Sequence, residues 1–144
     1  MHTEEREAAE EREAAEEREA AGELEAAGRG EPRIVDKPWG REVWYAHTER
    51  YAGKVLEVDK GHVLSLQKHV VKHETMLLQS GRMLFTLNDA IFEWLPGEVV
   101  SIPPGNVHRM EALDDSVILE VSTPELDDLV RLEDRYGRAG RKGY

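Results

Sequence analysis

The stretch that decides the fold is residues 61–81, GHVLSLQKHVVKHETMLLQSG. Glycines bound it at both ends, and apolar and polar residues alternate within it, a pattern typical of paired β-strands. It carries an amide, an imidazole and a carboxylate at Gln67, His69 and Glu74. A second stretch, which opens with a turn glycine, ends in another imidazole, His108. Hairpins that face each other across a barrel would bring these four side chains together.

The four side chains suit a divalent transition metal, because they offer two imidazole nitrogens, a carboxylate and an amide oxygen. Gln67 and His69 are two residues apart and therefore project to the same face of a strand. The faces that carry Glu74 and His108 continue with apolar or small residues, as expected inside a barrel. The sequence thus predicts a metal site; the alternative is that both histidines are ordinary interior or rim residues. Three further histidines, His47, His62 and His73, fall outside this pattern, and we expect them to be surface residues.

Length and composition bound the class of protein. The chain has 144 residues, which suffices for one domain with its own core but hardly for two. It has no cysteine, so disulfides and thiolate metal sites are excluded. No apolar run reaches the length of a membrane span, and the N-terminus lacks the apolar segment of a signal peptide. We therefore expect a cytoplasmic protein without a membrane partner.

The net charge of −11 is concentrated at the N-terminus. Residues 1–27 contain 11 Glu and 3 Arg, mostly in a six-residue repeat, EEREAA, of helix-forming residues. Each repeat would turn the alanine pair by ~240° around a helix, so the pairs do not build one apolar face. We expect residues 1–30 to form an acidic extension, either helical or disordered. The rest of the chain has no basic stripe, so we expect no nucleic-acid partner.

From residue 33 to about residue 124, short apolar–polar alternations are separated by turn signals such as Ser80-Gly81. Many short strands at even spacing predict an all-β sandwich or barrel. The predicted strands are residues 42–45, 54–58, 63–69, 74–79, 82–87, 91–95, 98–102, 108–112 and 117–121. Residues 124–138 are expected to form an extended arm or one short helix, packed on a barrel domain of residues 33–138. Residues 139–144 are expected to be a loose C-terminus.

The two glycine-containing stretches resemble the motifs of the cupin superfamily, G-x5-H-x-H-x3–4-E-x6-G and G-x5-P-x-G-x2-H-x3-N. The matching positions are Gly61, Gln67, His69, Glu74 and Gly81, then Gly97, Pro103, Gly105 and His108. Gln67 stands where most cupins have the first His, and Ala112 stands where they have Asn. The resemblance implies a double-stranded β-helix, or jelly-roll barrel. It also implies one divalent metal (Mn, Zn, Fe, Co or Ni) held by Gln67, His69, Glu74 and His108.

Longer strings are similar to the cupin domain of type II mannose-6-phosphate isomerases. LSLQKH at residues 64–69 is similar to LSLQxH, and KPWG at residues 37–40 to RPWG. DDLVRLEDRYGR at residues 127–138 is similar to DDIVRFEDxYGR, and IPPG with HRME, at 102–111, to IPxG…HRLE. Two departures are Lys72, at the position of a family Arg, and Thr75-Met76 in place of His-Trp.

This resemblance implies an aldose–ketose isomerase that acts on a sugar or sugar phosphate and forms a homodimer. Lys54, which matches a family lysine, and Arg135 are the candidate catalytic residues, and Lys72 and Arg138 the candidate substrate-binding residues. Lys54 could instead pack its stem at the barrel rim with its ammonium in water. The arginines could instead form surface ion pairs. An iron-dependent dioxygenase and a non-catalytic metal- or carbohydrate-binding protein remain as alternative functions.

Overall fold

The computed structural model describes Arg6 and residues 27–140. Most of the predicted extension, residues 1–30, and of the predicted C-terminus, residues 139–144, therefore lie outside the described residues. Within the described part, no helix is long and apolar enough to cross a membrane. Its regular elements are the strands β1 (Arg33–Lys37), β2 (Gly40–His47), β3 (Ala52–Val58), β4 (Leu66–Lys68), β5 (Glu74–Ser80), β6 (Met83–Leu87), β7 (Ala90–Trp94), β8 (Val99–Ile102), β9 (His108–Ala112), β10 (Ser116–Ser122) and β11 (Val130–Glu133).

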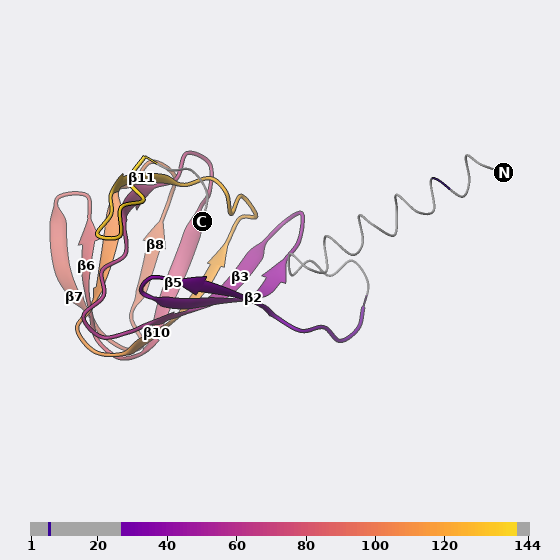
Figure 1. Cartoon of the computed structure of the whole chain (residues 1–144), viewed down its shortest axis with the longest axis horizontal. Coiled ribbons are helices and arrows are strands. Elements are labelled where there is room, and N and C mark those ends of the chain that lie inside the picture. Colours follow the sequence, from indigo (N-terminus) through magenta and orange to yellow (C-terminus); the bar gives the residue numbers. More distant parts are fainter. Residues whose placement is uncertain (1–5, 7–26, 141–144) are drawn as a thin grey trace.

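The strands form two antiparallel sheets that make up a barrel (Figure 1). The larger sheet has the order β1-β2-β3-β10-β5-β8, and the smaller has the order β11-β4-β9-β6-β7. This arrangement confirms the predicted all-β jelly-roll fold. Because β10 lies between β3 and β5, and β9 between β4 and β6, segments far apart in the sequence become neighbours. The sheet order therefore determines which side chains can meet inside.

Alternating residues of the two sheets fill the space between them, as the period of two requires. In β5, Glu74, Met76 and Leu78 are buried, whereas Thr75 and Leu77 between them are only half-buried. Met76 and Leu78 belong to an apolar core that also includes Leu56, Met83, Phe85, Trp94, Ile102, Met110 and Ile118. Glu74 thus continues an apolar face, which places a carboxylate at one end of the core.

The turn between β5 and β6 requires a glycine. Gly81 has φ +93°, and a Cβ at this position would lie 2.3 Å from Ser116 Oγ and 2.5 Å from the Asp115 carbonyl oxygen. No other residue fits without moving the backbone of the neighbouring strand β10. The glycine that ends the decisive stretch therefore lets the β5–β6 turn pack against β10.

The structure adds two strands that the alternation does not predict, β1 and β11. It also shortens the strand predicted at residues 63–69 to β4, with Val63 making an isolated bridge to Glu111. His69 therefore follows the strand instead of ending it. The cause is the loop at residues 70–72, whose amides bind the Asp128 carboxylate instead of a neighbouring strand.

Residues 124–138, the arm, contain no helix and combine turns with one short strand, β11. The strand β11 within the arm pairs with β4. His47 Nε2 lies 3.1 Å from the Pro124 carbonyl oxygen, and His62 Nδ1 lies 2.5 Å from Tyr136 Oη. The expectation that His47 and His62 are surface residues is therefore wrong, because both are half-buried against the arm. His73 is exposed, as expected.

Leu78→Ala should destabilise the barrel by about 2–5 kcal/mol, because it leaves a cavity in a close-packed core. Leu78 has an exposed fraction of 0%. Ile91→Ala, at a side chain that is 66% exposed, is the matched control and should change the free energy of unfolding by less than about 0.5 kcal/mol. Urea unfolding of both variants measures the difference, and equal stabilities would contradict the described packing.

Candidate metal centre

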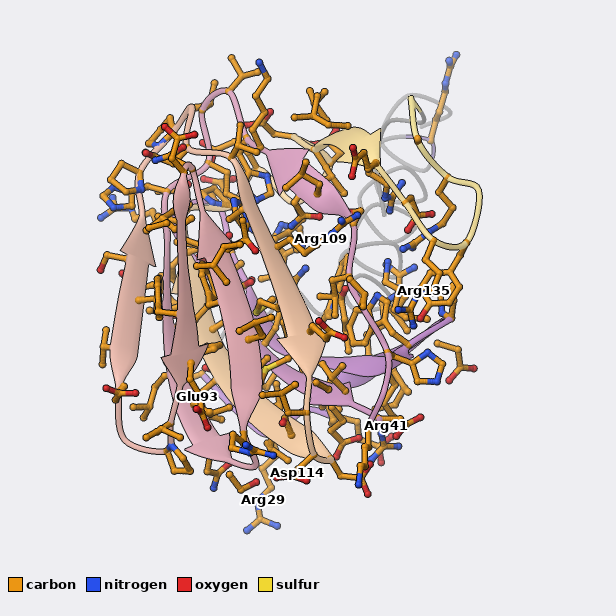
Figure 2. The ribbon with its side chains drawn as sticks, turned by 90° about the vertical axis from the view of Figure 1, so that its left-hand side faces the viewer. Arg29, Arg41, Glu93, Arg109, Asp114 and Arg135 are labelled. Atoms are coloured by element: carbon orange, nitrogen blue, oxygen red, sulfur yellow. The ribbon has the colours of Figure 1, made fainter. Side chains whose placement is uncertain are left out.

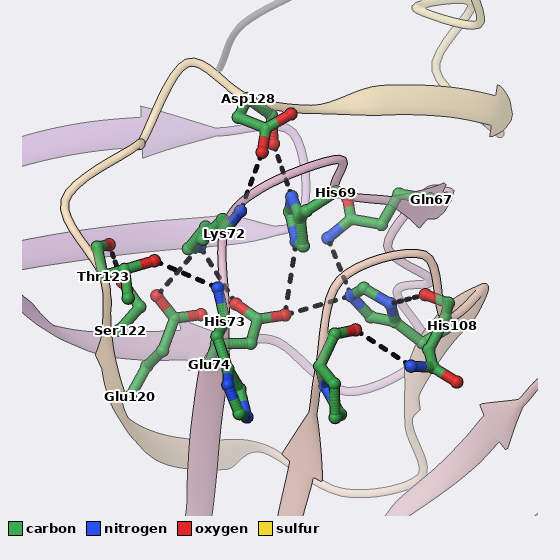
Figure 3. Close-up of polar contacts among 12 residues, drawn as sticks. Gln67, His69, Lys72, His73, Glu74, His108, Glu120, Ser122, Thr123 and Asp128 are labelled. Carbon is green, nitrogen blue, oxygen red and sulfur yellow. Dashed lines mark hydrogen bonds and ion pairs between the residues drawn. The ribbon is translucent and has the colours of Figure 1, made fainter.

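Three side chains converge at one end of the core (Figure 3). His69 follows β4, Glu74 is the first residue of β5, and His108 is the first residue of β9. Their ligand atoms all lie within 4.8 Å of one another. Glu74 Oε1 lies 3.3 Å from His69 Nε2 and 3.1 Å from His108 Nε2. All three side chains are buried.

Backbone carbonyls orient both imidazole rings. His69 Nδ1 donates to the Asp128 carbonyl oxygen at 2.5 Å, and His108 Nδ1 donates to the Asn106 carbonyl oxygen at 3.0 Å. A carbonyl oxygen only accepts hydrogen bonds, so in each ring Nδ1 carries the proton. In the neutral rings, Nε2 then carries a lone pair that faces Glu74. Metal-binding histidines are commonly oriented in this way.

This donor set fits a metal ion. His69 Nε2 is buried and makes no hydrogen bond. Two imidazole lone pairs and a carboxylate oxygen directed at one another repel unless a cation lies among them or a ring is protonated. Two imidazoles and one carboxylate suit Mn, Fe, Co, Ni and Zn alike, so the geometry does not select a metal.

Gln67 lies beside the triad, but its amide nitrogen, and not its oxygen, faces His108. Gln67 Nε2 lies 3.3 Å from His108 Nε2, and Gln67 Oε1 accepts a hydrogen bond from Ser65 at 2.8 Å. Coordination through Oε1 would require the amide to turn over and to release Ser65. The triad is therefore in place as it stands, whereas Gln67 is adjacent to it.

Asp128, in the arm, holds the loop that carries His69. Its carboxylate accepts three backbone hydrogen bonds, from Val70 at 3.0 Å, Val71 at 2.6 Å and Lys72 at 2.8 Å. Its carbonyl oxygen accepts the proton of His69 Nδ1. Burial would raise the pKa of Asp128, but these backbone donors hold it below its usual value. One residue thus positions both the loop and the imidazole.

Lys72 links the triad to a second carboxyl group. Its Nζ lies 2.9 Å from Glu74 Oε2 and 3.4 Å from Glu120 Oε2 (Figure 3). Burial alone would lower the pKa of Lys72, but Glu120 and Glu74 raise it above its usual value. Burial alone would raise the pKa of Glu74, but the Lys72 ammonium beside it holds the pKa well below the usual range. Burial raises the pKa of Glu120, so the two carboxyl groups differ in their affinity for a proton.

A second charged cluster lies on the strands β1, β2 and β3. Glu42 Oε1 accepts from Lys54 Nζ at 2.8 Å and from Trp44 Nε1 at 2.9 Å, and Glu42 Oε2 lies 3.6 Å from Lys37 Nζ. Burial would raise the pKa of Glu42, but the two lysines hold it below its usual value. Burial lowers the pKa of Lys37. The ammonium of Lys54 also lies 4.8 Å from the centre of the Trp44 ring.

Both clusters line one cavity of about 60 Å³. One water needs roughly 10–15 Å³, so several waters or part of a small ligand would fit. The wall contains Lys37, Trp39, Glu42, Lys54, Leu56, Leu64, Ser65, Gln67, His69, Lys72, Glu74, Met76, Met110, Glu120, Leu126, Leu129, Arg131 and Arg138.

Of the residues predicted to bind or transform a substrate, Lys54, Lys72 and Arg138 line this cavity. Lys54 is buried, so the alternative with its ammonium in water is wrong. Arg138 pairs with Asp134, at 2.9 Å from Nε to Oδ2, which is the ion pairing given as its alternative. Arg135 does not line the cavity; it is exposed and donates to the Gly61 carbonyl oxygen (Figure 2).

Sequence reasoning missed Lys37, Glu42 and Glu120 as cavity residues. The sequence did contain a signal for the two carboxylates. Glu120 is two residues from Ile118 in β10, and Glu42 is two residues from Trp44 in β2, so each shares a strand face with a buried apolar residue. An acidic residue on the inward face of a strand is expensive to bury without partners, and so it marks a site.

Asp128→Asn should weaken metal binding by about 10–100-fold. The side-chain nitrogen of Asn replaces one carboxylate oxygen and cannot accept a hydrogen bond from the N–H groups of the loop, so the loop that carries His69 is held less firmly. The neighbouring exposed residue gives the matched control, Asp127→Asn, which should bind as the unaltered chain does. Calorimetric titration with Zn²⁺ or Mn²⁺ measures both affinities, and urea unfolding of the metal-free proteins measures the loss of stability. Equal affinities would show that the hydrogen bonds of the Asp128 carboxylate to the loop do not position His69 for the metal.

The family model described as "Mannose-6-phosphate isomerase C-terminal" matches residues 29–134. The mannose-1-phosphate guanylyltransferase ManC of Salmonella typhimurium is 35% identical over 111 residues, which cover 74% of this chain and 23% of the relative. The corresponding enzyme of Escherichia coli K12 is 33% identical over the same length and shares. The chain thus spans about a quarter of these relatives.

Solved structures show the same fold. An RmlC-like cupin from Shewanella frigidimarina has a TM-score of 0.64 at 15% identity and covers 74% of this chain and 97% of its own. KdgF from a Halomonas species has a TM-score of 0.60 at 22% identity, with coverages of 66% and 88%. These identities support the fold alone. The match of the family model over residues 29–134 shows that the chain belongs to the mannose-6-phosphate isomerase C-terminal family and has its cupin domain.

Proposed function

We propose that the protein is a metal-dependent isomerase of a sugar or sugar phosphate. The observation that carries the proposal is the triad of His69, Glu74 and His108, whose ligand atoms lie within 4.8 Å of one another. His69 and Glu74 also line the cavity. The family description, mannose-6-phosphate isomerase C-terminal, supports the substrate class. A divalent ion bound there would polarise a sugar carbonyl and stabilise the enediolate charge.

The charges of the cavity favour an anionic substrate. Its wall contains five side chains of Lys or Arg and three of Glu. The five cations are Lys37, Lys54, Lys72, Arg131 and Arg138, and the three carboxylates are Glu42, Glu74 and Glu120. Arg138 is already paired with Asp134, but the other four cations still outnumber the three carboxylates, so a phosphorylated sugar complements the wall better than a neutral one.

Isomerisation also requires a group that moves a proton between adjacent carbons or to the carbonyl oxygen. Lys54 is our candidate, because its ammonium is buried at the cavity wall and Glu42 holds it in place at 2.8 Å. A lysine can give up its proton, whereas an arginine keeps its charge and does not. The pair of Lys54 and Glu42 therefore offers a positioned proton donor inside the barrel.

His69→Ala and His108→Ala should each abolish the interconversion of mannose-6-phosphate and fructose-6-phosphate measured with Mn²⁺, Zn²⁺, Co²⁺ or Ni²⁺. His73→Ala, at an exposed histidine, is the matched control and should keep full activity. Chelation should remove the activity and added metal restore it. Binding of metal and sugar without turnover would favour a non-catalytic cupin, and oxygen uptake with Fe²⁺ would favour a dioxygenase; either result would contradict the isomerase.

Lys54→Arg should lower kcat by about 10²–10⁴-fold while KM changes little, because the charge stays and the transferable proton is lost. Lys60→Arg, at an exposed lysine, should leave both constants unchanged. Steady-state kinetics of the metal-loaded proteins separates the two constants. A Lys54→Arg variant with an unaltered kcat would remove Lys54 from proton transfer.

A further inference from the structure

The loop between β8 and β9, residues 103–107, contacts both histidines of the triad. The Asn106 carbonyl oxygen accepts the proton of His108 Nδ1 at 3.0 Å, and the Gly105 N–H donates to the His69 carbonyl oxygen at 2.7 Å. The two imidazole rings lie 5.3 Å apart, centre to centre (Figure 3). The β8–β9 loop thus holds the ring of one candidate ligand and the backbone of the other.

An asparagine in the turn between β6 and β7 holds this loop in place. The Asn88 N–H donates to the Val107 carbonyl oxygen at 2.7 Å, and Asn88 Oδ1 accepts from the Val107 N–H at 3.0 Å. Asn88 has φ +52°, and in the described part of the chain it is the only residue other than glycine with a positive φ. Asparagine adopts this left-handed conformation more readily than most residues. The turn therefore keeps an uncommon backbone conformation at the residue that binds the β8–β9 loop.

Two side-chain amides extend this contact into the loop. Asn88 Nδ2 donates to Asn106 Oδ1 at 2.9 Å, and Asn106 Nδ2 donates to the Pro103 carbonyl oxygen at 2.9 Å. Backbone groups fix the direction of this chain of hydrogen bonds, because the Val107 N–H at one end only donates and the Pro103 carbonyl at the other only accepts. Each amide therefore has a single orientation that satisfies both of its partners.

The two amides serve the loop and not the core. Asn88 is exposed and Asn106 is half-buried, and neither lines the cavity. Because both polar atoms of its side chain are bound, Asn106 is held against rotation. Its backbone carbonyl accordingly keeps its direction toward His108 Nδ1.

We propose that Asn88 and Asn106 are positioning residues for His108 and act as one unit through the β8–β9 loop. A hydrogen bond from Nδ1 to a fixed carbonyl keeps the proton on Nδ1 and leaves the lone pair of Nε2 for a cation. When the carbonyl is free to move, the ring can turn and its other tautomer becomes accessible. The proposal rests on the metal site of the proposed function, but it does not rest on turnover, because its consequence is the affinity for a cation.

The amide pair is separate from the contact that positions the other histidine. Asp128, in the arm, accepts the proton of His69 Nδ1. In the five-stranded sheet, the strand β11 of the arm lies at one edge and β7, which follows the Asn88 turn, lies at the other. The two imidazoles are therefore oriented from opposite edges of the same sheet.

Asn106→Ala should lower the affinity for Co²⁺ by about 10-fold. Asn88→Gly should lower it in the same direction, because glycine keeps the positive φ and removes only the amide. The double variant should bind within about twofold of Asn106→Ala, since residues of one hydrogen-bonded chain do not act additively. Asp89→Gly, at the exposed neighbour in the same turn, is the matched control and should bind as the unaltered chain does.

Calorimetric titration measures these affinities, and the visible absorption of bound Co²⁺ reports a change in the geometry of its ligands. Urea unfolding of the metal-free proteins checks that each variant is folded. Nitrogen NMR of metal-free protein adds a readout that a loss of stability alone would not move. His108 should carry its proton on Nδ1 in the unaltered chain and in Asp89→Gly, and should show a mixture of both tautomers in Asn106→Ala.

Three results would overturn the proposal. They are an Asn106→Ala variant with unaltered Co²⁺ affinity and tautomer, additive effects of the substitutions at Asn88 and Asn106, and an unaltered chain that binds no Co²⁺. Tight Co²⁺ binding without isomerisation of a sugar phosphate would contradict the proposed isomerase alone and would leave the positioning role standing.

Discussion

A buried carboxylate at the end of an apolar core governs the rest of this structure. Glu74 is almost inaccessible to water, and an isolated charge in such a place costs several kcal/mol. The Lys72 ammonium compensates it at Oε2, whereas Oε1 faces the two imidazoles, where a bound cation would complete the compensation. The sharing of Lys72 with Glu120, the bend after β4 and the contact of the arm with that bend all serve to bring these partners to Glu74. The arrangement of the candidate site therefore also serves to neutralise a buried charge.

The period of two explains what could be predicted from the sequence. It gave the strands that carry Glu74 and His108, because alternating inward residues mark both the core and the ligands that interrupt it, but it placed His69 inside a strand that ends before it. It could not give β1 and β11, whose partners are set by contacts with the barrel, nor the amide orientation of Gln67. Arg135 and Arg138 lie in an irregular arm without a period, so their spacing could not show which one reaches the cavity. The same period places Glu42 and Glu120 on the inward faces of β2 and β10, so these two carboxylates could have been predicted as well.

The family match and the cavity agree on where chemistry would occur. The matched residues 29–134 include the triad, both charged clusters and most of the arm. Of the residues that line the cavity, only Arg138 lies beyond the matched region. The ammonium of Lys72 contacts two buried carboxylates, Glu74 at 2.9 Å and Glu120 at 3.4 Å. This lysine, which stands at the position of a family Arg, therefore has a structural role within this chain, whatever its effect on a bound substrate.

The double contact of Asp128 makes the mouth of the barrel a single cooperative unit. The amides of residues 70–72 and the ring of His69 all end on this one residue of the arm. When the arm lifts, those amides lose their acceptor, and the ring loses its anchor as well. Local opening, cation release and exposure of the buried charges would accordingly share one free energy, so the ion would stabilise the arm as much as the arm retains the ion.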